Sequence, residues 1–167
     1  MRAAFDLLYG RLLVPSVMLL GFATTLVVLA QILGRHLMTV PFPWTEELSR
    51  FLFIWFCVLG SVVALVRRQH LGIDFLVQRM PAEPQRITLI VVDLLVALFG
   101  AFVLVKSIDL MQIASFQRSN IMRIPMPYIY VAFPIMGFFF AFHGVLEIMD
   151  KLRGKVVPPT ATIVPSP

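Results

Sequence analysis

Four long runs of apolar residues constrain the fold of this chain more than any motif does. They occupy residues 12–33, 51–66, 87–105 and 124–146, and Asp93 is the one formal charge inside them. Hydrophobic residues make up 59% of the chain and charged residues only 14%, whereas a typical soluble domain has ~25% charged residues. So few charges cannot cover a globular surface in water, and the sequence therefore predicts an integral membrane protein.

The lengths of these runs predict four transmembrane helices. A helix needs ~20 residues to cross a hydrocarbon core ~30 Å thick, so we extend the short second run back to Glu46. The expected helices cover about residues 12–34, 46–66, 87–113 and 124–149. Together they form one all-α membrane domain over residues 1–155. The proline-rich segment 156–167 is expected to be a disordered cytoplasmic tail.

Basic residues are unequally divided between the two ends of these helices, which predicts their orientation. If the N-terminus is cytoplasmic, nine basic residues lie in inner segments and three in outer segments. The nine are Arg2, Arg11, Arg67, Arg68, Arg79, Arg86, Lys151, Arg153 and Lys155, and the three are Arg35, Arg118 and Arg123. The positive-inside rule therefore predicts that both termini face the cytoplasm. Topology and anionic lipid account for the net charge of +5, which gives no argument for a nucleic-acid partner.

Charged residues cluster at the predicted start of the second helix. Thr45 is a candidate N-cap, and Glu46 and Glu47 then lie in the first turn, where the helix dipole favours negative charge. Arg50 is spaced to pair with either carboxylate, and Trp44 suits the membrane interface. The cluster is typical of a helix start at the outer membrane surface, and it is also suited to docking another membrane subunit. A catalytic carboxylate pair is disfavoured, because no polar substrate site converges on it.

A second group of polar residues follows the second helix. Arg67 and Arg68 are ordinary residues for the cytoplasmic end of a span. His70 and Asp74 lie in the turn that follows, where we expect contacts with lipid headgroups. The segment of about residues 72–80 is too short to span, and it is predicted to form a short interfacial helix between the second and third spans.

Three charges in the third helix have structural explanations. Asp93 lies deep enough that it should face protein rather than lipid. Lys106 and Asp109 are i,i+3 neighbours that can neutralise each other. A proton or sodium relay through Asp93 lacks polar neighbours on the other helices, so a buried, hydrogen-bonded structural aspartate is the favoured interpretation. In the fourth helix, Pro134 should produce a kink.

The sequence indicates no enzyme, no cofactor and no metal site. Haem ligation needs two imidazoles at one depth on facing helices, and of His36, His70 and His143 only the last two come near this. A small homo-oligomeric exporter would want an acidic residue in the first helix, and residues 12–33 contain none. The alternative that stays open is a membrane anchor or cytochrome-type subunit of an oxidoreductase.

The pattern of residues 44–74 resembles the small membrane (permease) subunit of tripartite ATP-independent periplasmic (TRAP) transporters. The resemblance in length, helix number and orientation covers about residues 12–150. Its motifs are the Trp44-to-Arg50 cluster, the Phe53-Ile54-Trp55 run, the Gly60-Ser61 step and the stretch from Arg67 to Asp74.

This resemblance implies a scaffold subunit of a sodium-driven importer in a bacterial inner membrane. The implied partners are a large TRAP membrane subunit and a periplasmic substrate-binding protein. The implied substrates are organic acids such as C4-dicarboxylates or sialic acids. Residues implied at the subunit interface and in positioning the second helix are Trp44, Glu46, Glu47, Arg50 and Trp55. His70 and Asp74 would fix the cytoplasmic turn.

Overall fold

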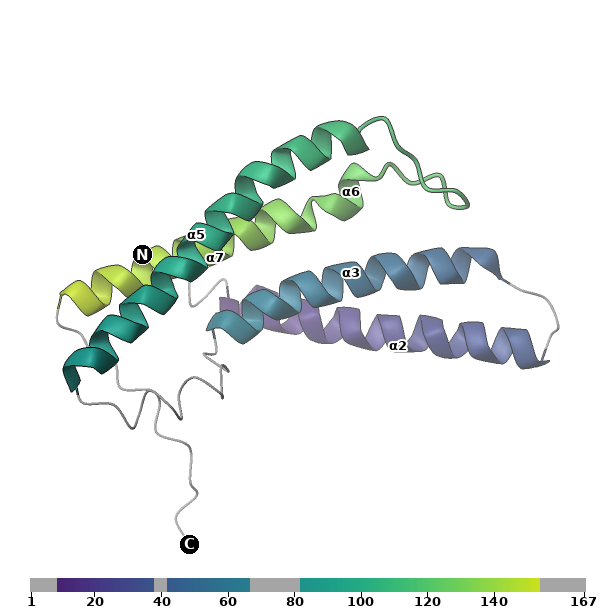
Figure 1. Cartoon of the computed structure of the whole chain (residues 1–167). Coiled ribbons are helices and arrows are strands. Elements are labelled where there is room, and N and C mark those ends of the chain that lie inside the picture. Colours follow the sequence, from purple (N-terminus) through teal and green to yellow (C-terminus); the bar gives the residue numbers. More distant parts are fainter. Residues whose placement is uncertain (1–8, 38–41, 67–81, 154–167) are drawn as a thin grey trace, which may run out of the picture.

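The computed structural model of the chain describes residues 9–37, 42–66 and 82–153, and these residues are almost entirely helical (Figure 1). The elements are the π-helix η1 (Tyr9–Leu13) and the α-helices α2 (Val14–Leu37), α3 (Pro43–Val66), α5 (Ala82–Ala114), α6 (Pro127–Tyr130) and α7 (Ala132–Leu152). Four helical segments are long and apolar enough to cross a membrane: Arg11–His36, Pro43–Val66, Ile87–Ala114 and Pro127–Leu152. The predicted all-α architecture with four transmembrane helices is confirmed.

The second span starts earlier than predicted, and Thr45 does not cap it. Helix α3 begins at Pro43, where a proline is well suited to the first helical position because no intrahelical partner awaits its missing N–H. The hydroxyl of Thr45 donates to the carbonyl of Phe42 at 2.6 Å, and its backbone N–H donates to the same carbonyl at 3.0 Å. Thr45 is therefore a buried residue of the first turn, and the prediction that its hydroxyl accepts a free N–H was wrong.

The fourth span begins at Pro127 and is interrupted at Val131. Pro134 has no N–H to donate to the carbonyl four residues earlier, so the helix is weakened where α6 gives way to α7. The interruption is one residue long and Val131 keeps helical φ and ψ, so the kink expected at Pro134 stays a prediction. Residues 124–126 were predicted to be helical and instead belong to the loop before α6.

The helices are arranged as two antiparallel hairpins that meet along α3 and α7. Helix α2 packs on α3, α3 on α7, and α7 on α5, so α2 and α5 are the outer members of the set (Figure 1). A buried apolar cluster joins the hairpins, and it consists of Leu13, Leu59, Val62 and Phe139. Val62 has no exposed surface and is the largest fully buried side chain in the described part.

Glycines let α5 and α7 approach backbone to backbone. A Cβ atom on Gly137 would lie 2.7 Å from the backbone nitrogen of Leu104, and one on Gly100 would lie 2.8 Å from the carbonyl oxygen of Gly137. Further along, a Cβ on Gly144 would lie 2.8 Å from the carbonyl oxygen of Asp93. Membrane helices usually pack through close approach at small residues. Lipid tails are as apolar as the side chains, so the hydrophobic effect does not drive the helices together and van der Waals contact must do so.

The outer helices present long apolar faces to their surroundings. The exposed side chains on α2 include Met18, Leu19, Phe22, Leu29 and Leu33, and those on α5 include Leu95, Leu98, Phe102, Val105 and Ile113. An apolar surface of this size requires lipid or a membrane partner rather than water. The interfacial helix predicted at residues 72–80 and the tail at 156–167 lie outside the described residues, so both remain predictions. The division into one domain over residues 1–155 also remains a prediction.

Candidate functional site

The charged cluster at the start of α3 forms one ion pair on its exposed side. Arg50 donates from Nη2 to Glu46 Oε1 at 3.1 Å, and both side chains are 67% exposed. Trp44 is exposed beside this pair, and its ring centroid lies 6.4 Å from that of Phe42. An exposed i,i+4 pair contributes little to stability, so these residues are available for contacts beyond the helix.

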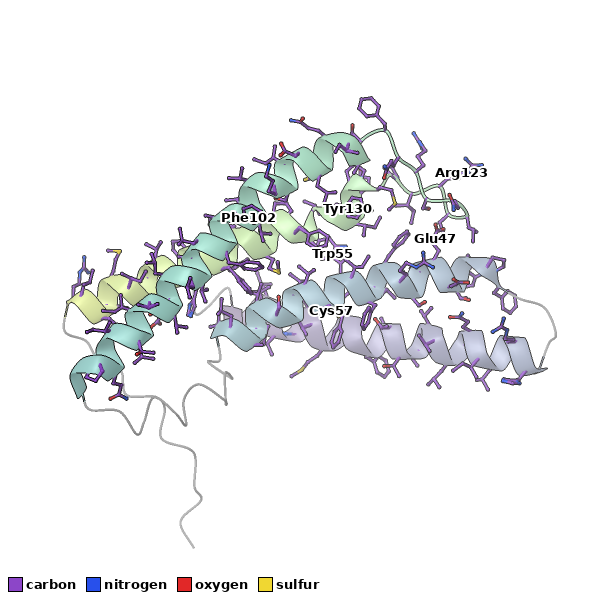
Figure 2. The ribbon with its side chains drawn as sticks, in the orientation of Figure 1. Glu47, Trp55, Cys57, Phe102, Arg123 and Tyr130 are labelled. Atoms are coloured by element: carbon purple, nitrogen blue, oxygen red, sulfur yellow. The ribbon has the colours of Figure 1, made fainter. Side chains whose placement is uncertain are left out.

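Glu47 has a different partner, which is the loop between α5 and α6. Its Oε1 atom accepts a hydrogen bond from the backbone N–H of Asn120 at 3.0 Å, and its Oε2 atom accepts from Ile121 at 3.2 Å and Met122 at 2.7 Å. Figure 2 shows Glu47 between α3 and this loop. One carboxylate therefore attaches the loop between the third and fourth spans to the beginning of the second.

A short hairpin within residues 115–126 turns these three N–H groups toward Glu47. Arg118 and Pro125 form an isolated antiparallel bridge, and the N–H of Ser119 donates to the carbonyl of Ile124 at 2.9 Å. The N–H of Ile124 returns a hydrogen bond to the hydroxyl of Ser119 at 3.1 Å. Arg123 adopts a left-handed conformation with φ of 57°, which reverses the chain. Successive N–H groups in such a turn make a concave site for an anion, and Glu47 fills it.

A buried ion pair joins α5 and α7 near the opposite end of the molecule. Lys151 donates to the carboxylate of Asp93 and also to the carbonyl of Leu89 at 3.2 Å. The side chains of Lys151 and Asp93 are 8% and 18% exposed. The prediction that Asp93 faces protein and is hydrogen-bonded is confirmed.

A second ion pair in α5 is exposed. Lys106 and Asp109 pair at 3.2 Å, as predicted from their i,i+3 spacing. The described part of the chain contains no group of three or more His, Cys, Asp and Glu side chains that could hold a metal ion.

Of the remaining predicted site residues, the structure describes one, and the other four lie outside the described residues. Trp55 is half-buried on α3, where it packs against the apolar cluster between the hairpins (Figure 2). Arg67, Arg68, His70 and Asp74 lie outside the described residues, so their predicted contacts with the turn and with lipid headgroups remain predictions.

Two features of the site were missed by sequence reasoning. The first is the loop contact of Glu47, which is made mainly by backbone N–H groups together with the side chain of Ser119. Backbone groups have no sequence signature beyond the turn residues around them. The partner of Asp93 is Lys151, which had been assigned only to the excess of positive charge at the cytoplasmic side. A search for a lysine at matching depth on another helix could have found this second contact.

Comparisons with known proteins give a consistent result. The family model described as "Tripartite ATP-independent periplasmic transporters, DctQ component" matches residues 24–154. The isethionate TRAP transporter permease protein DctMQ of Oleidesulfovibrio alaskensis is 33% identical over 115 residues, which are 68% of this chain and 18% of that protein. The sialic acid TRAP transporter permease protein SiaT of Haemophilus influenzae is 32% identical over 140 residues, which are 83% of this chain and 23% of that protein.

A shorter relative matches over most of its own length. The sialic acid TRAP transporter small permease protein SiaQ of Vibrio cholerae is 25% identical over 123 residues, which are 74% of this chain and 71% of that protein. In contrast, this chain spans less than a quarter of the length of DctMQ and of SiaT. The segment shared with these two relatives is thus a small part of each.

Proposed function

This chain belongs to the DctQ component family of tripartite ATP-independent periplasmic transporters, and from that premise we propose that it is a scaffold subunit for sodium-driven import of an organic acid. It is a multi-pass membrane protein and a small TRAP permease subunit. In the proposal it pairs with a large permease subunit, and a periplasmic binding protein delivers the substrate. Isethionate, sialic acids and C4-dicarboxylates are the candidate substrates, since relatives are named for them.

The scaffold role is supported by how the charged side chains inside the spans are paired. A chain that moves an ion or an organic acid needs free polar ligands near the middle of the membrane or a water-lined cavity. Asp93, the acidic residue deepest in the predicted spans, is paired with Lys151. The other charged pair of α5, Lys106 with Asp109, is neutralised within one helical turn. This use of charge supports a chain that stabilises an assembly.

The lengths of two relatives, compared with the segment that this chain matches, support a large partner. DctMQ and SiaT are named as permease proteins, and each contains far more chain than the segment matched here. In this proposal the segment matched here works beside a large permease subunit. In this proposal the apolar outer faces of α2 and α5 provide surface for that partner and for lipid.

The proposed orientation follows from the distribution of basic residues. We place the chain in the bacterial inner membrane with both termini in the cytoplasm, because nine basic residues then lie inside and three outside. The start of α3 and the loop held by Glu47 would face the periplasm. There Trp44, Glu46 and Arg50 would contact the partner, and Glu47 would act through the loop that it holds.

Reconstitution tests the proposal. Proteoliposomes are prepared with this chain alone, with the large permease subunit alone, and with both, each in the presence of the binding protein. Uptake of labelled isethionate, sialic acid and C4-dicarboxylates is measured under an inward sodium gradient. We expect uptake of at least one substrate only when both membrane chains are present. Sodium-driven uptake by this chain alone would overturn the scaffold role.

A further inference from the structure

The loop held by Glu47 has an outward face that the Glu47 contact does not use. Arg118, Asn120 and Arg123 are exposed on this loop, whereas Ser119 is buried. Within the described residues, neither arginine has a hydrogen bond or a salt bridge, although Arg50 and Lys106 at the same end of the molecule each pair with a carboxylate. The loop therefore presents two uncompensated positive charges.

The hairpin register places Arg118 and Pro125 on one face, because the two residues form an antiparallel bridge. Arg123 is left-handed, so strand alternation does not apply to it, and its direction is seen in Figure 2. The opposite side contains buried Ser119 and half-buried Ile124. In Figure 2, Arg123 extends from the loop on the side away from α3, from which Glu47 approaches.

Exposed apolar side chains border the two arginines. Phe116 follows the end of α5 and is 92% exposed, and Tyr128 at the start of α6 is 70% exposed. Ile121 at the tip of the hairpin is 50% exposed. Aromatic and aliphatic side chains next to arginines, at the ends of apolar helices, are typical of segments that lie in the headgroup region of a membrane.

The Glu47 contact determines the height of the loop relative to the membrane. Glu47 lies in the first turns of α3, beside exposed Trp44 and the Glu46–Arg50 pair. Charged and tryptophan side chains at the end of a span mark the membrane–water interface. Because three hydrogen bonds hold Asn120, Ile121 and Met122 against Glu47, the hairpin lies at this interface and within reach of lipid headgroups.

We propose that the outward face of this hairpin binds the phosphate of an anionic phospholipid through Arg118 and Arg123, with Phe116 and Ile121 in the adjoining acyl boundary. Arginine suits this ligand because its planar guanidinium donates paired hydrogen bonds to phosphate oxygens. The proposal concerns lipid binding by the chain itself, so it holds whatever substrate the transporter imports and whichever side of the membrane this end faces.

Because the backbone of Arg123 is left-handed, its structural role in the turn can be tested separately from its proposed role in lipid binding. A left-handed conformation suits glycine or asparagine, and a long side chain adopts it only at a cost. Replacing Arg123 with glycine removes the charge while it relieves the backbone. A purely structural role predicts no loss of lipid affinity in this variant, whereas lipid binding predicts a clear loss.

The test measures binding of phosphatidylglycerol to the purified full-length chain in phosphatidylcholine-containing micelles, by native mass spectrometry. In the double variant R118Q/R123Q we expect the tightest phosphatidylglycerol affinity to fall about 25-fold, from about fivefold for each arginine near an anionic lipid surface. The variant R123G is expected to lose about fivefold in affinity, with a melting temperature that is not lowered.

The variant R35Q is the matched control, because Arg35 is an exposed arginine at the same end of the molecule but lies on α2, outside the loop. Its affinity for phosphatidylglycerol should equal that of the wild type. Wild-type affinity in R118Q/R123Q, or an equal loss in R35Q, would overturn the proposal. Wild-type affinity in R118Q/R123Q would instead indicate that the two arginines bind another partner, such as an acidic protein surface.

Discussion

At the scale of single residues, Glu46 and Glu47 show how neighbouring carboxylates on one helix take different roles. Glu46 faces outward and bonds Arg50, one turn along the same helix. Glu47 is turned by about 100° from it around the helix axis, toward the loop of residues 115–126, and accepts three backbone hydrogen bonds there. Both carboxylates occupy a helix N-terminus, where negative charge is favoured, but only Glu47 links distant parts of the chain.

The residue-scale prediction compares Glu47→Gln with Glu46→Gln. A neutral amide loses the charge-assisted hydrogen bonds and brings donors of its own toward the loop N–H groups. In Glu47→Gln we expect amide hydrogen exchange at Asn120, Ile121 and Met122 to accelerate by about tenfold or more. Glu46→Gln, which affects only an exposed pair, should leave these three amides unchanged. Equal protection of the three amides in both variants would show that Glu47 does not hold the loop.

At the scale of the elements, the α5–α7 hairpin is held by backbone proximity and by one buried ion pair. Gly100, Gly137 and Gly144 leave no room for a Cβ atom between the two helices. The Asp93–Lys151 pair lies in the same interface, near the C-terminal end of α7. Van der Waals contact along a groove of small residues is the main attraction available to helices in lipid, and the ion pair fixes which residues face each other.

The element-scale prediction uses glycine-to-alanine variants. Gly137→Ala and Gly144→Ala introduce a Cβ within 3 Å of backbone atoms on α5, so each should destabilise the protein by about 1–3 kcal/mol. Gly60→Ala is the matched control, because the nearest atom to its Cβ would be Val17 Cγ1 at 3.9 Å, which is an ordinary contact. Gly60→Ala should be neutral or slightly stabilising, since alanine is the better helix former. Unfolding titrations in mixed micelles measure all three, and equal stabilities would contradict the close packing.

At the scale of the whole molecule, the described residues include two contacts that join the two hairpins. The first is the apolar cluster of Leu13, Leu59, Val62 and Phe139, and the second is the Glu47 contact with the α5–α6 loop. Because α2 and α5 are the outer helices, their exposed faces are open to lipid or to a large partner subunit, which the proposed scaffold role would require.

The whole-molecule prediction concerns Val62, which has no exposed surface at the joint between the hairpins. Val62→Ala should destabilise the chain by about 1–2 kcal/mol, through lost packing and the cavity left behind. Phe53→Ala on the same helix is the control, since Phe53 is exposed and its removal should leave the stability of the isolated chain unchanged. The fluorescence of Trp55, which packs against the cluster, reports the transition. A larger effect of Phe53→Ala than of Val62→Ala would contradict this joint.

Much of the fold follows from local properties of the sequence. Where the observed helix bounds differ from the predicted ones, the cause is local too. The second span is helical up to Val66, the last residue that the structure describes before Arg67, so its predicted end at residue 66 stays a prediction. Its predicted start at residue 46 gives the second helix enough residues to cross the hydrocarbon core, whereas the helix begins three residues earlier, at Pro43. The third span starts at Ile87, as predicted, and helix α5 is already formed at Ala82, since a helix can continue beyond the hydrocarbon core when its residues tolerate water.

By itself, the sequence determined the number of spans, their approximate ends and the Glu46–Arg50 and Lys106–Asp109 pairs. Apolar length and helical spacing are properties of neighbouring residues, so they can be read along the chain. Only the tertiary structure decided that Glu47 holds a loop more than 70 residues away, that Asp93 pairs with Lys151, and that three glycines bring α5 against α7. Each of these depends on the relative placement of helices, which is fixed by packing between distant segments and leaves no periodic pattern in the sequence.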